Sequence, residues 1–200
     1  MRITLEHVGK KYGKSWIFKN VNLSFEPGQT YAILGNNGSG KSTLLKLLSG
    51  QTAPNQGEIE FENTAIEKVY QKISFCAPYI DLIEELTLDE LLDFVEKHKP
   101  FLPDYPKKRI VELFAFDSKK WIKDYSSGMK QRVKLALALF ADVELCLLDE
   151  PTSNLDEQGV EWYLNTLEKM PKNRTLIIAS NLEREYGFCT HKIDINQYKK

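Results

Sequence analysis

The chain has 200 residues, 42% of them hydrophobic, and its 27 basic and 28 acidic residues leave a formal net charge of −1. This composition is typical of a globular protein with a substantial core, and the balanced charge gives no electrostatic reason to expect nucleic acid as a partner. The sequence has no stretch near the ~20 consecutive apolar residues that a membrane-spanning helix needs and no signal-peptide pattern, so we expect a cytoplasmic chain.

The first part of the chain alternates short apolar segments with turn residues, which is typical of β structure. Five segments are predicted strands: residues 2–8, 21–25, 30–35, 58–63 and 72–77. Residues 10–15 are predicted to form the turn after the first strand. Residues 41–50 change to a helical spacing of leucines and end at Gly50, which predicts a helix.

The second part of the chain is helical at first and then alternates. Residues 88–99 and 107–116 predict two helices inserted between strands of a sheet. The segments that follow alternate between helix and strand: helix 126–142, strand 144–150, helix 156–170, strand 175–180, a short helix near 182–188 and strand 192–196. Strands that alternate with helices predict an α/β fold with a parallel sheet covered on both faces. We expect a single domain over residues 1–200 with a helical subdomain at about residues 86–130.

The segment "GNNGSGKST", Gly35 to Thr43, follows a predicted strand and opens a predicted helix, as a phosphate-binding loop does. Its three glycines, Gly35, Gly38 and Gly40, allow the backbone to curl so that N–H groups point inward. Lys41 adds a cation for the β and γ phosphates, and the Ser42 hydroxyl can bind magnesium. The alternative is a chance glycine-rich turn, but strand, loop, Lys-Ser and helix in this order favour ATP or GTP.

Two acids end the apolar segment "ELCLLDEP", Glu144 to Pro151. Asp149 can hold magnesium through water, while Glu150 points elsewhere and can activate the attacking water as a general base. Two acids after a strand are more often a helix cap or a solvated turn. The phosphate loop upstream reverses that preference.

Residues Ser126, Ser127 and Gly128 open the predicted helix 126–142. Free N–H groups and the positive end of the helix dipole predict a second anion site there. The alternative is a plain capped helix. The order of the three motifs along the chain argues against that alternative.

At this point the sequence resembles the ATP-binding subunit of ABC transporters over essentially its whole length. Gly35 to Thr43 is similar to the Walker A loop, with Asn36, Asn37 and Ser39 among its nucleotide-binding residues. Tyr125 to Met129 resembles the Leu-Ser-Gly-Gly-Gln signature, and Leu145 to Glu150 resembles Walker B with its catalytic glutamate. Ser153 to Asp156 resembles the D-loop, and Tyr12 resembles the aromatic residue that stacks on adenine.

The resemblance implies an α/β fold with a P-loop NTPase core and a mostly parallel sheet. It also implies an antiparallel β subdomain at the N-terminal side and a small helical subdomain inserted before the signature motif. Function follows from the same resemblance: two ATP-binding domains, as a homodimer or heterodimer, meet head to tail and bind and hydrolyse Mg-ATP between them. Ser126 and Gly128 would contact the γ phosphate of the partner's ATP, and hydrolysis would drive a separate membrane-spanning permease subunit at the inner face of the cell membrane.

Two positions depart from the family pattern. The family usually has a glutamine near magnesium where this chain has Pro78, and a switch histidine near the γ phosphate where this chain has Asn181. A proline cannot replace an amide ligand, and asparagine donates a hydrogen bond but cannot shuttle a proton. We expect the chain to bind Mg-ATP well and to hydrolyse it slowly, with Glu150, Lys41 and Asn181 as its catalytic residues.

Two other functions stay open at this stage. One is a soluble ABC-type ATPase that works on nucleic acid or ribosomes, although such proteins usually carry a coiled-coil insertion or two ATP-binding domains. The other is a module that dimerises on binding ATP without meaningful turnover. For the transporter, acidic and aromatic residues between Pro78 and Thr87 are expected to contact the membrane subunit. The length of the chain weakly favours an exporter.

Overall fold

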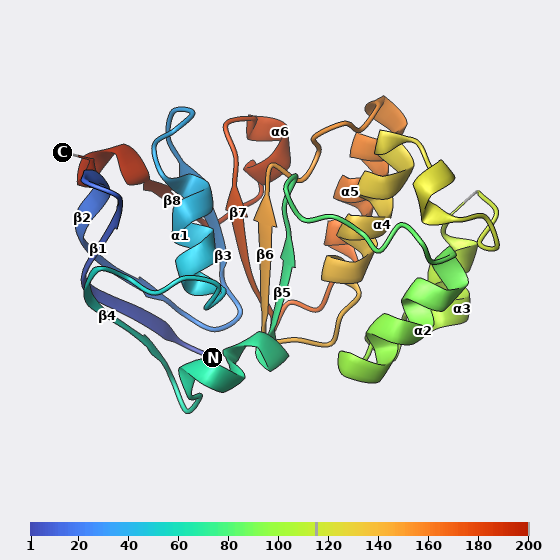
Figure 1. Ribbon diagram of the computed structural model, residues 1–200, viewed down its shortest axis with the longest axis horizontal. Coiled ribbons are helices and arrows are strands. Elements are labelled where there is room, and N and C mark those ends of the chain that lie inside the picture. Colours follow the sequence, from blue (N-terminus) through green and yellow to red (C-terminus); the bar gives the residue numbers. More distant parts are fainter. Residues whose placement is uncertain (115, 200) are drawn as a thin grey trace. The chain divides into compact units, whose positions relative to one another are not determined.

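The computed structural model describes residues 1–114 and 116–199, and the fold separates into two compact units (Figure 1). The first unit comprises Met1–Phe75, Val143–Glu150 and Pro171–Lys200. The second unit comprises Cys76–Asp142 and Pro151–Met170, and it contains the predicted helical insertion. The single domain over residues 1–200 stays a prediction.

The first unit contains an antiparallel sheet of three strands in the order β2-β1-β4. Its strands are β1 (Ile3–Tyr12), β2 (Ser15–Phe25) and β4 (Gln56–Phe61). The predicted turn at residues 10–15 is wrong in extent, because Tyr12 pairs with Ser15 and only two residues connect the strands. Gly13 has a φ of 57°, and a two-residue hairpin loop of this kind requires such a positive φ.

A second sheet has five strands in the order β5-β6-β7-β3-β8. The strands are β5 (Ile73–Cys76), β6 (Leu145–Asp149), β7 (Thr175–Ala179), β3 (Thr30–Leu34) and β8 (His191–Asp194). The pairs β6–β7, β7–β3 and β3–β8 are parallel, as the alternation of helices and strands predicts. Every residue of β6 and β7 is buried, which explains why these segments are continuously apolar apart from Asp149 and Thr175.

Helix α1 (Lys41–Leu48) buries its four leucines in a core to which both sheets contribute. Shorter elements complete the first unit: the 3₁₀ turns η1 (Ile66–Lys72) and η3 (Ile195–Tyr198), and helix α6 (Glu183–Tyr186). Because β3, β6 and β7 are parallel, their carboxyl ends lie at the same edge of the sheet. The residues that follow these strands are therefore gathered at that edge.

The second unit is helical, with α2 (Leu88–His98), α3 (Lys107–Glu112), η2 (Ile122–Asp124), α4 (Ser127–Leu139) and α5 (Glu157–Glu168). Helix α2 begins at a capping box in which Thr87 and Glu90 satisfy each other's backbone N–H groups. The predicted helix 107–116 ends at Glu112, and its residue 115 lies outside the described residues. Within residues 1–114 and 116–199, we find no helix of the length and apolar character that crossing a bilayer requires.

Candidate functional site

The loop between β3 and α1 has a conformation that requires glycine at two positions. Gly40 has a φ of 104°, and a Cβ there would lie 2.5 Å from Cγ2 of Ile17. A Cβ at Gly35 would lie 2.6 Å from the Ser39 hydroxyl oxygen. The loop is closed on itself by the Ser39 N–H, which donates to the Asn36 carbonyl at 3.0 Å. The predicted glycine-rich curl is therefore present.

The amino end of α1 faces this loop without a side-chain cap. Its N-cap residue is Gly40, and the first turn of the helix contains no acidic residue. The backbone N–H groups of a helix's first turn have no partner within the helix, and the helix dipole is positive at this end. Both features favour an anion at the loop.

Lys41 is buried, and its ammonium group is held by the loop itself. Its Nζ donates to the Gly35 carbonyl oxygen at 2.7 Å and to the Asn36 carbonyl oxygen at 3.4 Å. Burial lowers the pKa of Lys41, and the negative charges of Glu150 and Asp149 oppose this by raising it. The two carboxylates thus help to keep a cation at the centre of the loop.

Asp149 and Glu150 follow β6 with very different exposure. Asp149 is buried with 2% of its surface exposed, whereas Glu150 is exposed. Glu150 has a φ of 45°, which is uncommon for a residue other than glycine, and its N–H donates to the Ala179 carbonyl at 2.9 Å. The two adjacent acids therefore differ in their exposure to solvent.

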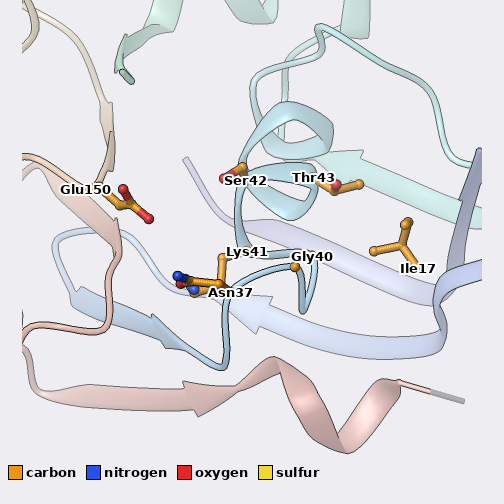
Figure 2. A pocket seen from close by; sticks show the side chains of 8 residues that line it. Ile17, Asn37, Gly40, Lys41, Ser42, Thr43 and Glu150 are labelled. Carbon is orange, nitrogen blue, oxygen red and sulfur yellow. The ribbon is translucent and has the colours of Figure 1, made fainter. Parts of the chain in front are cut away.

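A pocket of about 240 Å³ lies between the loop and Glu150. Its lining residues are Ile17, Asn37, Gly38, Gly40, Lys41, Ser42, Thr43 and Glu150. Figure 2 shows Glu150 pointing into the opening opposite Asn37 and Ser42, with Ile17 on the far side of the loop. The space suits a phosphate group better than a whole nucleotide, because ligand pockets commonly exceed about 300 Å³.

The sequence prediction of the pocket missed Ile17. Tyr12, predicted to stack on adenine, is 51% exposed near the end of the β1–β2 hairpin, and Ile17 comes from β2 of the same hairpin. Lys10 lies with its Nζ 5.4 Å from the centre of the Tyr12 ring. Nothing in the residues around Ile17 signals its place in the pocket, since an isoleucine in a strand usually belongs to a core.

Asn181 follows β7 and reaches the phosphate loop. Its Nδ2 donates to Oδ1 of Asn37 at 2.8 Å, across 144 positions of the sequence. Asn37 itself lines the pocket. The structure thus brings the loop Gly35–Thr43, Glu150 and Asn181 together, whereas Tyr12 and Asp149 belong to the same unit and are not among the residues that line the pocket.

The predicted second anion site belongs to the second unit. Ser126 is the N-cap of α4, and its hydroxyl accepts a hydrogen bond from the Met129 N–H at 3.2 Å. Ser127 is exposed in the first turn, and a Cβ at Gly128 would lie 3.1 Å from the Asn154 carbonyl oxygen. Glycine is therefore the residue that allows the segment around Asn154 to approach the helix closely.

Two polar residues of α4 that the sequence prediction missed connect this helix to the segment 151–156. The buried Gln131 donates from Nε2 to the Pro151 carbonyl oxygen at 2.8 Å. Arg132 forms an ion pair with Asp156 at 3.1 Å, and Asp156 also caps α5. The Asp156 pKa is lowered, first by the Gly159 N–H and then by Arg132. These contacts hold the segment 151–156 against the first turns of α4.

Comparison with known proteins decides the family. A model of the ABC transporter family matches residues 18–153, which is more than half of the chain. The chain belongs to the ABC transporter family. The predicted family and the predicted fold class are thereby confirmed.

Similar ABC proteins include resistance and transport proteins. The chain is 32% identical over 200 residues to the linearmycin resistance ATP-binding protein LnrL of Bacillus subtilis, covering 95% of this chain but only 64% of LnrL. It is 32% identical over 190 residues to the lantibiotic transport ATP-binding protein SrtF of Streptococcus pyogenes, covering 92% of this chain and 81% of SrtF. A solved ATP-binding cassette, described as a dimer in a post-hydrolysis state bound to ADP and Pi, superposes with a TM-score of 0.82. That cassette is 25% identical and the match covers 97% of this chain and 95% of the cassette.

Helix α4, which begins at the predicted signature motif, also contacts the segment that contains Pro78, the first departure from the family pattern. Lys134 of α4 donates from Nζ to the Pro78 carbonyl oxygen at 3.3 Å. One helical turn earlier, Lys130 forms an ion pair with Glu84. The segment after β5 is thus held by two lysines on one face of α4, through a backbone carbonyl and a carboxylate.

Proposed function

We propose that this chain binds and hydrolyses Mg-ATP in a head-to-tail dimer and so drives a separate membrane-spanning subunit. The observation that carries the proposal is the pocket in which the phosphate loop, Lys41 and Glu150 converge. A loop of this shape cradles phosphates with backbone N–H groups, and a carboxylate across the pocket has the position that a general base needs.

In this proposal each residue of the pocket has a distinct role. The backbone of Gly35, Asn36, Asn37, Gly38, Ser39, Gly40 and Thr43 surrounds the phosphates. The Lys41 ammonium exchanges its bonds to the loop carbonyls for bonds to phosphate oxygens, because a doubly charged anion is a stronger acceptor. Glu150 takes the proton of the attacking water, and Asn181 donates a hydrogen bond to the terminal phosphate.

Magnesium fits the donor set at the same edge of the sheet. Magnesium prefers oxygen ligands and usually combines one or two carboxylates with phosphates and waters. The Ser42 hydroxyl and Glu150 line the pocket, and Asp149, the last residue of β6, directly precedes Glu150. Ser42 and Asp149 would hold the ion, which would neutralise phosphate charge when bound.

The dimer and the membrane partner rest on the relatives. The solved cassette that superposes on this chain is described as a dimer, and LnrL and SrtF are described as resistance and transport proteins. We infer a head-to-tail dimer in which Ser126, Ser127 and Gly128 of one copy contact the ATP of the other. A membrane subunit would hold the dimer at the inner face of the cell membrane, and the names of the two relatives favour an antibiotic-like compound as the transported substrate.

The docking surface for that subunit is proposed on the segment between Pro78 and Thr87. Tyr79 and Ile83 are 44% and 42% exposed, and Trp121, whose backbone pairs with Thr87, is 48% exposed. Glu84 is a poor residue for a test because its ion pair with Lys130 also holds the signature helix. We therefore expect Ile83→Asp to abolish co-purification with the membrane subunit, whereas Ile66→Asp, at an equally exposed isoleucine of the first unit, leaves it intact.

Single-turnover hydrolysis tests the proposed enzyme. With enzyme in excess over radiolabelled ATP, we expect the wild-type chain to release phosphate, and Lys41→Ala to release none because it no longer binds the triphosphate. Equal phosphate release from both proteins would contradict the proposed site.

A second candidate function, an ATP-switched dimerisation module, is favoured by Pro78 and Asn181. Both residues lack chemistry that the family pattern supplies, and losing one transition-state donor lowers a rate by about 10²- to 10³-fold. ATP-dependent dimerisation without phosphate release over hours would support the switch. A rise in turnover in Asn181→His would instead identify Asn181 as the residue that slows the enzyme.

A further inference from the structure

Asn181 and Asn37 form a side-chain pair between two segments that the chain order keeps far apart. Asn181 follows β7 and Asn37 belongs to the phosphate loop, and the Nδ2 of Asn181 donates to Oδ1 of Asn37 at 2.8 Å. Both side chains are exposed, so water competes for the bond and its strength is modest. We therefore expect the bond to affect the orientation of the Asn181 side chain more than the stability of the fold.

In this structure the Asn181 amide is held against the loop with its donor end toward Asn37. An asparagine amide has a donor end with two N–H groups and an acceptor end with an oxygen. Because Asn37 accepts with its oxygen, the donor end of Asn181 is turned toward the loop. The second N–H of the same NH₂ group stays available for a phosphate oxygen at the pocket, whereas the reversed amide would present an oxygen to an anion.

The backbone of the same segment is held independently. Ser180 is buried with 1% exposed, and its hydroxyl accepts a hydrogen bond from the Leu182 N–H at 2.9 Å. The Ser180 N–H donates to the Ile33 carbonyl at 3.3 Å, which ties the segment to the end of β3 just before the phosphate loop. The backbone thus fixes where Asn181 lies, and its amide is bonded to the Asn37 side chain.

We propose that Asn37 is a positioning residue for Asn181: it holds the neutral amide with its donor end toward the terminal phosphate of ATP. The proposal rests on the proposed function of the pocket. It explains how an asparagine serves at a position where the family usually has an imidazole, since a flexible amide without this bond would populate both orientations. Preorganised donors stabilise charge that develops in a transition state, because they need no reorientation during the reaction.

The first test needs no nucleotide and reads the bond directly. In a ¹⁵N-labelled chain, the side-chain NH₂ resonances of Asn181 are those that disappear in Asn181→Ala. We expect them to shift in Asn37→Ala, which removes the acceptor, and to stay close to the wild-type position in Asn37→Asp, which retains an acceptor oxygen. Asn165→Ala on α5 is the matched control and should leave them unmoved.

The second test reads the consequence for turnover. Loss of the orienting bond is expected to lower kcat for ATP by about 3- to 10-fold in Asn37→Ala, with a change in KM below about twofold. Asn181→Ala should lower kcat by at least as much. The double variant should be no slower than Asn181→Ala alone, because Asn37 acts only through Asn181.

The outcomes separate this proposal from the function on which it rests. Asn37 does not position Asn181 if the kcat losses of the two single variants multiply in the double variant. The same conclusion follows if the Asn181 side-chain resonances do not shift in Asn37→Ala. If wild type and Lys41→Ala release phosphate equally, the proposed ATPase site fails while the resonance test still reports on the side-chain pair.

Discussion

Glu150 shows how the local backbone serves the chemistry of a single residue. Its φ of 45° lies in the left-handed region, which costs a residue other than glycine about 1–3 kcal/mol unless the surroundings enforce it. Here the buried strand β6 precedes it, and its own N–H bonds to the Ala179 carbonyl. The resulting turn directs the carboxylate into the pocket while the adjacent Asp149 stays buried (Figure 2).

Because Glu150 lies at the pocket, the variant Glu150→Gln tests its assigned role as the general base. The amide has the same shape and cannot take a proton from water, so we expect kcat for ATP to fall by about 10²- to 10⁴-fold. Nucleotide binding should be retained, because the phosphate loop and Lys41 are unchanged. Turnover and binding of a fluorescent ATP analogue measure the two effects. The control is Glu161→Gln at an exposed carboxylate of α5, and a Glu150→Gln rate within threefold of wild type would rule out the assigned base.

At the scale of elements, the hydrophobic periodicity predicted those strands and helices whose pattern lies in consecutive residues. The apolar runs at residues 144–150 and 175–180 are β6 and β7, and the leucine stripe after Lys41 is α1. The end of α3 at Glu112 was not predictable, because the apolar pattern of residues 107–116 continues past it.

The candidate site also divides into residues that a local pattern predicts and contacts that it does not. Gly35 to Thr43, Asp149 and Glu150 could be predicted because each belongs to a motif of consecutive residues. Ile17 and the Asn37–Asn181 bond could not, since each depends on how distant segments meet. The resemblance to the ABC family pointed to Asn181, but only the geometry connects it to Asn37.

Glu144, just before β6, predicts a pH dependence of stability. It forms ion pairs with Lys72 at 2.9 Å and with the amino terminus of Met1 at 2.9 Å. The hydrogen bond from Lys72 and then that from the amino terminus hold the Glu144 pKa below its ordinary value of 4.5. A carboxylate whose pKa is lowered by folding stabilises the protein above its unfolded pKa, and this contribution is lost as pH falls through the folded pKa.

We therefore expect Glu144→Gln to lower Tm by about 1–4 °C at pH 7, a modest effect because the carboxylate is 44% exposed to screening solvent. The difference from wild type should shrink as the pH is lowered below 4.5. Calorimetry at several pH values measures it, with the exposed Glu161→Gln as control. A difference that stays constant down to the acid limit would show that the ion pairs are not its cause.

At the scale of the whole molecule, the two halves of the proposed site lie in different units. The phosphate loop, Asp149, Glu150 and Asn181 belong to the first unit, whereas Ser126 to Gly128 belong to the second. The contacts Gln131–Pro151 and Arg132–Asp156 connect the first turns of α4 to the segment 151–156. In a head-to-tail dimer each ATP would use the first half from one copy and the second half from the other.

Complementation between two inactive variants tests this arrangement. Lys41→Ala disables the first half of the site, and Gly128→Asp disables the second, since it adds a negative charge and a Cβ where only 3.1 Å separates that position from the Asn154 carbonyl. A mixed dimer carries both defects in one site and leaves the other site intact. Mixing equal amounts should therefore restore roughly a quarter of the wild-type rate, because half of the dimers are mixed and each has one working site. If each copy instead completed its own site, the mixture would stay as inactive as either variant alone.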